Sequence, residues 1–76
     1  MKTINMFMLE CVANLLNCYI EENNYSDWEI EIVNSGLKLI NKSTKQYATW
    51  SIYDYGEDYE VIKSKIIKFL KLQYNH

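Results

Sequence analysis

Apolar residues recur at helical spacing over the first part of the chain, and the pattern predicts a helix from about Thr3 to Asn23. Its polar side chains recur every three or four residues and so form one stripe, made of Glu10, Asn14, Asn17 and Glu21. At about 100° per residue the apolar positions cover about 220°, whereas a helix packed on a sheet needs only about 100°. The surplus surface includes Phe7, Cys11 and Cys18, and we expect it to contact a partner or a second copy of the chain.

The period of the pattern then changes to two, which is typical of strands with one buried face. It predicts three strands, over residues 28–32, 37–42 and 47–53. In the third strand we assign Ala48, Trp50 and Ile52 to the core. Short polar connections at residues 33–36 and 43–46 make the three strands an antiparallel meander.

A second helix is predicted at the end of the chain, after an acidic loop from Asp54 to Asp58 that contains Gly56. Asp58 can cap this helix, because its carboxylate accepts hydrogen bonds from free backbone N–H groups. The apolar stripe consists of Tyr59, Ile62, Ile66, Phe69 and Leu70. Four lysines flank the stripe: Lys63, Lys65, Lys68 and Lys71. The fold class is therefore α+β in the order α-β-β-β-α, with both helices packed on one face of the sheet.

A chain of 76 residues and 9.1 kDa forms one domain over residues 1–76, without room for two lobes and a deep cleft. It has no Arg or Pro, and Lys, Asn, Ile and Tyr make up 32 of the 76 residues, as in AT-rich genomes of bacteria and their phages. Neither a signal peptide nor the roughly 20 apolar residues of a membrane span can be recognised, so we expect a cytoplasmic protein of a bacterial host.

Catalytic and metal-binding chemistry is poorly supplied. Cys11 and Cys18 are seven residues apart, about 10.5 Å along a helix, so they cannot form an intrachain disulfide, and burial as small apolar side chains is the simplest interpretation. The single histidine is His76, which leaves too few ligands for a metal. Without Arg, an internal His or a glycine-rich phosphate loop, we expect no enzyme, no cofactor and no metal.

The most unusual stretch runs from Tyr53 to Glu60, where three tyrosines alternate with carboxylates around one glycine. One interpretation is a strand end, a loop and a helix cap, with the acids placed to suit the helix dipole. The other is a recognition surface, because tyrosine is enriched in binding patches and carboxylates suit a basic partner. For that surface we predict the partner-binding residues Tyr53, Asp54, Tyr55, Glu57, Tyr59, Glu29 and Glu31.

The α-β-β-β-α order and the length resemble the double-stranded RNA-binding domain. That family binds RNA phosphates with lysines at the start of its last helix. This chain has Gly56-Glu57-Asp58-Tyr59-Glu60 there, and these carboxylates would repel RNA. We therefore carry over no RNA-contact residue from the family. In its size, acidity and phage-like composition the chain also resembles small phage-encoded anti-CRISPR and anti-defence proteins. That resemblance implies a non-enzymatic inhibitor that occupies a functional surface of a host effector.

The net charge of −2 and a pI of about 5.2 argue against a general nucleic-acid binder, which normally has a basic surface. We therefore expect an anti-CRISPR-like inhibitor whose acidic, tyrosine-rich surface binds a host protein with a basic groove. Two alternatives stay open. One is a nucleic-acid-binding module that uses the lysine-rich last helix, and the other is a homo-oligomeric regulatory protein that uses the surplus face of the first helix.

Overall fold

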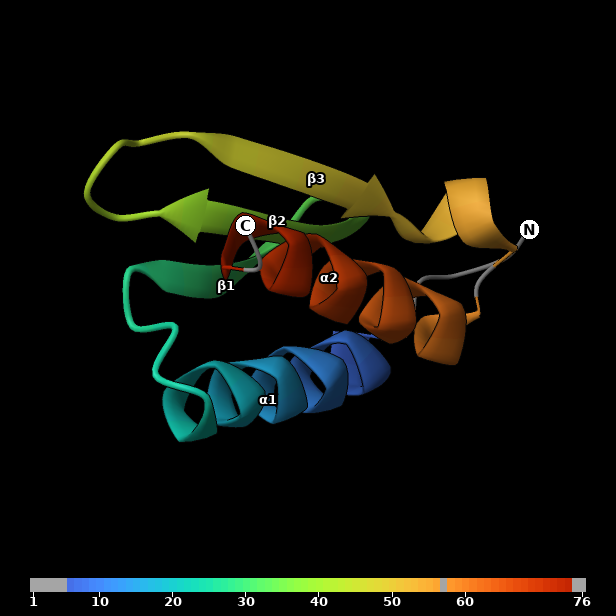
Figure 1. Cartoon of the computed structure of the whole chain (residues 1–76). Coiled ribbons are helices and arrows are strands. Elements are labelled where there is room, and N and C mark those ends of the chain that lie inside the picture. Colours follow the sequence, from blue (N-terminus) through green and yellow to red (C-terminus); the bar gives the residue numbers. More distant parts are fainter. Residues whose placement is uncertain (1–5, 57, 75–76) are drawn as a thin grey trace.

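The computed structural model describes residues 6–56 and 58–74, and it has the predicted α-β-β-β-α order (Figure 1). The bounds of the elements are α1 Met6–Glu22, β1 Trp28–Val33, β2 Gly36–Asn41, β3 Tyr47–Ser51, a 3₁₀ helix Ile52–Tyr55 and α2 Tyr59–Tyr74. The proposed start of the first helix, Thr3, lies outside the described residues. Helix α1 ends one residue before the predicted Asn23, and Asn24 adopts the left-handed conformation (φ 60°) that asparagine tolerates at such a position.

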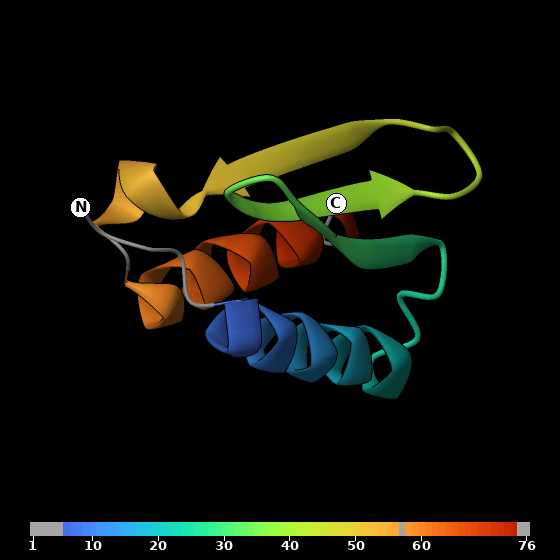
Figure 2. The ribbon, with the colours of Figure 1, turned by 180° about the vertical axis from the view of Figure 1, so that it is seen from behind.

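The three strands form one antiparallel sheet in the order β1-β2-β3, which confirms the meander. Ile30 pairs with Leu39 and Leu39 with Ala48, so the core-facing residues of the three strands lie in one row across the sheet. Both helices cover the same face of this sheet, and no helix of the described residues lies over the other face (Figures 1 and 2). Within the described residues, no helix is both long and apolar enough to cross a membrane.

The prediction that β3 continues to Tyr53 is wrong, and so is the prediction of a loop directly after it. The strand ends at Ser51, and the chain turns into the 3₁₀ helix from Ile52 to Tyr55. The Ser51 side chain accepts a hydrogen bond from the backbone N–H of Tyr53, and Gly56 closes the turn in the left-handed conformation (φ 61°). The sequence pattern missed this turn because Ile52 is buried either way, as a strand residue or as the first residue of the turn.

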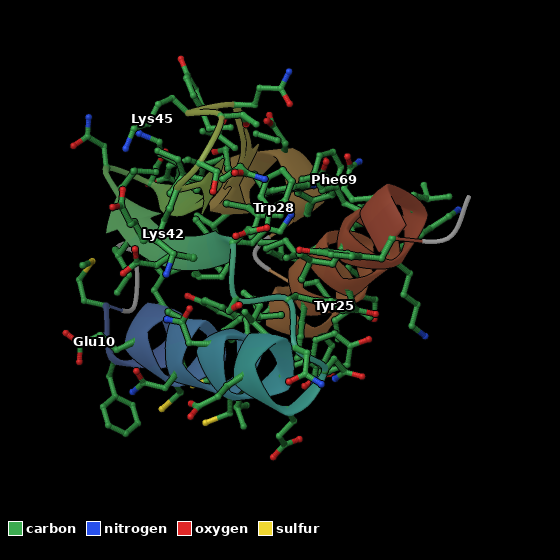
Figure 3. The ribbon with its side chains drawn as sticks, turned by 60° about the vertical axis from the view of Figure 1, so that its left-hand side comes forward. Glu10, Tyr25, Trp28, Lys42, Lys45 and Phe69 are labelled. Carbon is green, nitrogen blue, oxygen red and sulfur yellow. The ribbon has the colours of Figure 1, made fainter. Side chains whose placement is uncertain are left out.

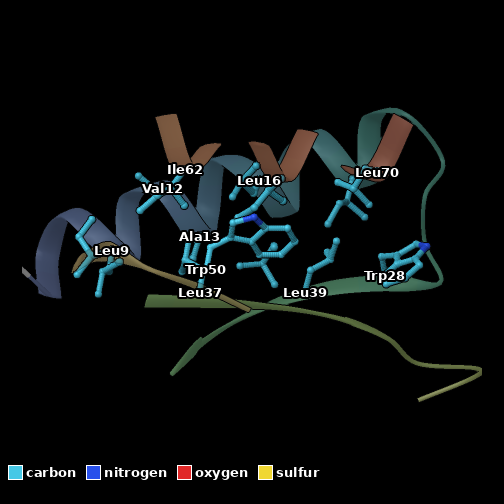
Figure 4. Packing of buried hydrophobic residues seen from close by; sticks show 14 residues of the cluster. Leu9, Val12, Ala13, Leu16, Trp28, Leu37, Leu39, Trp50, Ile62 and Leu70 are labelled. Carbon is cyan, nitrogen blue, oxygen red and sulfur yellow. The ribbon is translucent and has the colours of Figure 1, made fainter. Parts of the chain in front are cut away.

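The core lies between the sheet and the two helices (Figure 4). Trp50 and Ile52 lie in it together with Leu16 and Ile66, as the predicted faces require. Its buried residues are Leu9, Val12, Ala13, Leu16, Ile20, Trp28, Ile30, Leu37, Leu39, Trp50, Ile52, Ile62, Ile66 and Leu70. The ring of Phe69 packs edge-on against both tryptophans, with centroid distances of 5.8 Å to Trp28 and 5.6 Å to Trp50.

Only one side of α1 is buried, so the interpretation of both cysteines as buried side chains is wrong. Cys18 is exposed and Cys11 is half-buried, and both thiols are free. Helix α1 lies at one border of the molecule, where the sheet and α2 contact it from one side (Figure 1). The opposite side therefore keeps its apolar residues in solvent, as the wide apolar arc predicts.

Candidate protein-binding surface

The residues from Ile52 to Gly56, which we call the Tyr53 turn, are held by the fold at both ends. The Ile52 side chain is fully buried, and its backbone N–H donates to the carbonyl oxygen of Ser35 at 2.8 Å. At the other end the backbone N–H of Gly56 donates to the carbonyl oxygen of Ile52. The turn is therefore fixed against the β1–β2 connection and is not a free loop.

Some of the predicted binding residues in and after the Tyr53 turn are exposed to solvent, and others are partly buried. Tyr53 is 55% exposed and Asp54 is exposed beside it. Tyr55 is half-buried and packs against the core, so the expectation that the loop exposes it is wrong. Tyr59 is also half-buried, as its place in the apolar stripe of the last helix predicts. The amino group of Lys65 lies 5.6 Å from the centre of the Tyr55 ring. Glu57 lies outside the described residues.

The start of α2 shows why one acid of this segment has a structural role. The Asp58 carboxylate accepts hydrogen bonds from the backbone N–H groups of Glu60 at 3.1 Å and Val61 at 3.2 Å. This confirms the predicted helix cap. A substitution of Asp58 would therefore change the stability of α2. Tyr53 and Asp54 are the residues to substitute when binding is tested.

The uncovered face of the sheet carries the other predicted binding residues. We call it the open sheet face, and it consists of Glu29, Glu31, Lys38, Ile40, Tyr47 and Thr49. The register places these side chains in two rows across the sheet, one with Glu29, Ile40 and Tyr47 and the other with Glu31, Lys38 and Thr49. Both glutamates are exposed, as predicted.

The two groups of predicted acids are not continuous. Glu31 lies on β1, the Tyr53 turn follows β3, and β2 with Lys38 runs between them. Two strand spacings amount to about 10 Å, so a partner that contacts both groups must also cover the middle of the sheet. The surface that could bind a partner is therefore broader and less acidic than the sequence suggests.

Tyr47 belongs to this surface and was not among the predicted binding residues. It is 64% exposed, and the Lys38 amino group lies 4.7 Å from its ring centre, within cation–π range. The strand alternation already places Tyr47 opposite the core-facing Trp50 side of β3. An exposed large aromatic on that face was therefore the available signal.

A second exposed apolar surface lies on α1, on the side away from the sheet. We call it the α1 stripe, and it consists of Phe7, Met8, Cys11, Leu15 and Cys18. Phe7 is 69% exposed and Leu15 is 57% exposed. This stripe contains all three residues predicted for the surplus face of the first helix. Because it points away from the open sheet face, the two surfaces can bind different molecules.

The lysines of α2 do not form one continuous basic patch. Lys63 pairs with Glu60 at 2.9 Å, and Lys65 contacts the ring of Tyr55. Lys65 and Lys68 line a shallow hollow of about 330 Å³ together with Glu60, Val61 and Ser64. The Glu60 carboxylate offsets part of the charge of the two lysines, so the hollow attracts anions only weakly.

Among the described residues, no group of three or more His, Cys, Asp or Glu side chains is placed to hold a metal ion. The same residues include no buried side-chain nitrogen or oxygen that lacks a hydrogen-bond partner. Comparisons of the chain with protein-family models, with curated proteins and with solved structures found no match.

Proposed function

We propose that this protein is a small non-enzymatic binding protein of phage type, which inhibits a host nucleic-acid-handling protein through the Tyr53 turn and the open sheet face. The observation that carries the proposal is the exposed pair Tyr53 and Asp54 on a turn whose first residue, Ile52, is fully buried. An aromatic side chain on an anchored turn loses little conformational freedom on binding. It can therefore act as an anchor in a partner's pocket.

The charge distribution supports a partner with a basic groove. Asp54, Asp58 and Glu60 lie at the end of the molecule that carries the Tyr53 turn. Lys42 and Lys45 lie in the β2–β3 connection, at the opposite end of the sheet (Figures 1 and 3). Attraction of the acidic end toward a basic surface would leave Lys42 and Lys45 far from that surface. Lys63 and Lys65 lie at the acidic end, where Lys63 pairs with Glu60 and Lys65 lies over the Tyr55 ring. A protein groove that normally holds nucleic acid has the required charge.

The proposal is tested by binding kinetics with an effector that is captured from a bacterial lysate and then purified. Tyr53→Ala should increase the dissociation rate at least tenfold, because a central aromatic anchor is lost. Asp54→Lys should lower the association rate, and the difference from the parent should shrink at high salt. The purified effector should also release or fail to bind its nucleic acid when the parent protein is added.

Two control variants alter exposed residues of the helices, outside the Tyr53 turn and the open sheet face. Glu21→Lys reverses a charge on α1, and Leu72→Ala truncates an apolar residue on α2 that is 61% exposed. Both should bind like the parent. If Tyr53→Ala and Asp54→Lys also bind like the parent while staying folded, the Tyr53 turn is not the recognition surface and the proposal fails.

Nucleic-acid binding by α2 is the second candidate, and the hollow beside Lys65 and Lys68 is the observation that favours it. It predicts binding to mixed-sequence DNA or RNA that weakens steeply with salt and is lost in Lys65→Ala with Lys68→Ala. Under the first proposal neither nucleic acid binds measurably at physiological salt. The same titration therefore separates the two functions.

A further inference from the structure

The α1 stripe has the spacing of a helix-pairing surface. Met8, Cys11, Leu15 and Cys18 follow one another at intervals of three, four and three residues, the pattern of a coiled-coil seam. At about 100° per residue the whole stripe, including Phe7, spans about 100° of the helix surface. This equals the width that a helix normally buries against one neighbour.

The charges of α1 favour a particular neighbour. The helix has no acidic residue in its first turn and no basic residue in its last turn, where Glu21 and Glu22 lie instead. Two carboxylates at the negative end of the helix dipole are unfavourable, and the positive end lacks a compensating acid. A second α1 in antiparallel orientation would place its carboxylates beside the positive end of the first helix. A parallel copy would place carboxylate beside carboxylate.

We infer that the α1 stripe is the interface of a symmetric homodimer, in which α1 packs antiparallel against α1 of a second copy. Met8 and Leu15 occupy one class of seam position, and Cys11 and Cys18 occupy the other. In an antiparallel pair each class packs against the other, so Cys11 contacts Leu15 of the second copy and Met8 contacts its Cys18. The two-fold axis then passes between Cys11 and Leu15. An isologous interface of this kind closes at two copies.

The groove between α1 and α2 of one copy is consistent with the same dimer. A hollow of about 280 Å³ lies beside the stripe, between α1 and α2. Its lining is mainly apolar, with Leu15, Leu16, Cys18, Tyr19 and Ile67, and also includes Glu22 and Lys63. Met8 lies on the same side of α1 as Leu15 and Tyr19, seven and eleven residues before them. The two-fold axis therefore brings Met8 of the second copy over this hollow, where a flexible thioether side chain can fill the irregular space.

The dimer does not depend on the proposed function, because helix α1 and the open sheet face lie on opposite sides of the molecule (Figures 1 and 2). Two recognition surfaces would face outward from one dimer. A single helix pair is a small contact compared with a standard interface of about 800 Å² per partner. We therefore expect a reversible dimer that dissociates on dilution.

Sedimentation equilibrium over a dilution series tests the assembly. The parent should approach twice 9.1 kDa at the highest concentrations and fall to the monomer mass on dilution. Leu15→Lys should remain a monomer throughout, because it places a charge at the centre of the stripe. Leu72→Lys is the matched control, since Leu72 is similarly exposed, at 61% against 57% for Leu15, and should dimerise like the parent.

Oxidative cross-linking tests the orientation. In the variant Cys18→Ser the remaining Cys11 faces Leu15 of the second copy in the antiparallel pair. The two Cys11 residues of the dimer are then four residues apart, about 6 Å along the helix axis. The two Cys11 Cα atoms are then too far apart for a disulfide, so no covalent dimer should form. Adding Leu15→Cys should produce covalent dimers rapidly. Covalent dimers of Cys18→Ser alone would indicate a parallel pair, and a parent that stays monomeric at every concentration would overturn the interface.

Discussion

At the scale of single residues, the two glycines of the chain have very different surroundings. Gly36 looks in the sequence like an ordinary turn glycine. In the structure it opens β2 and lies directly against the backbone of Trp50 and Ser51 on β3.

The two glycines of the chain should therefore respond differently to alanine. In Gly36→Ala the new Cβ would fall on the carbonyl oxygen of Trp50, so the β2–β3 pairing must shift. The cost should lie at or above the upper end of the about 1–3 kcal/mol that overpacking typically costs. Gly56→Ala meets no atom within 4 Å and keeps only the strain of its left-handed backbone, about 1–2 kcal/mol. Urea denaturation of both variants measures the difference. A Gly36→Ala protein as stable as Gly56→Ala would contradict the close approach of the strands.

At the scale of elements, the pattern located the helices and strands but misjudged one polar residue of α1. Asn17 belongs by spacing to the solvent-facing polar stripe. Its side-chain oxygen instead accepts from the backbone N–H of Ile30 at 3.0 Å, and its amide donates to the carbonyl oxygen of Ile30 at 3.4 Å. The side chain thus covers the outer edge of β1, which strand periodicity cannot show.

Removal of this contact should weaken the attachment of α1 to the sheet. Asn17→Ala leaves the N–H and carbonyl groups of Ile30 without the amide, which should cost about 1–3 kcal/mol. It also exposes the edge of β1 and should increase aggregation at high concentration. Asn14→Ala, an exposed residue of the same stripe, should change stability by less than about 0.5 kcal/mol. Equal denaturation midpoints for both variants would show that Asn17 has no such role.

A cluster of three tyrosines joins the ends of both helices on the side of the molecule opposite the Tyr53 turn. Tyr25 lies between the helices (Figure 3), stacks on Tyr74 at 4.3 Å and meets Tyr19 edge-on at 6.0 Å. Burial raises the pKa of Tyr19 above its ordinary value of 10.0, and the neighbouring Tyr25 adds to the shift. Burial also raises the pKa of Tyr74, with Asp27 as a further cause.

The cluster should make the fold sensitive to strong base. A tyrosine whose pKa is raised in the folded state stabilises the fold below the unfolded pKa, and this stabilisation is lost as the pH rises through the folded pKa. The urea concentration at the midpoint of denaturation should therefore decrease as the pH is raised above 10.0, the ordinary tyrosine pKa. The double variant Tyr19→Phe with Tyr74→Phe should lose less stability over the same range. Identical pH dependence in parent and double variant would exclude the cluster as the cause.

At the scale of the whole molecule, the element order and the face that each strand turns to the core were predictable, because both follow from periodicity along the chain. The candidate surface was predictable only in part. Tyr53 and Asp54 are presented as expected, but Tyr55 turns toward the core and Lys38 separates the acids of β1 from the Tyr53 turn. Neighbours across strands are set by register, which depends on turns that the pattern leaves undetermined.

The helices and the sheet share one core, and substitution of Trp50 should show whether this core unfolds as a unit. Trp50 is 9% exposed and shares the Phe69 ring with Trp28, so it connects β3 through α2 to β1. Trp50→Ala should cost about 3–5 kcal/mol, a large part of the roughly 4–11 kcal/mol expected for a domain of this size. Trp50→Phe keeps an aromatic ring against Phe69 and should cost clearly less.

The remaining Trp28 makes the measurement specific, because its fluorescence reports on β1, the strand farthest from the substitution. With one cooperative core, the Trp28 fluorescence and the far-ultraviolet circular dichroism of Trp50→Ala should change together, at a much lower urea concentration than in Trp50→Phe. Tyr47→Ala, on the same strand but on the open sheet face, should lower stability by less than about 1 kcal/mol. A Trp28 signal that stays at the parent midpoint in Trp50→Ala would show that β1 and α1 fold without β3, and the core would then consist of two independent parts.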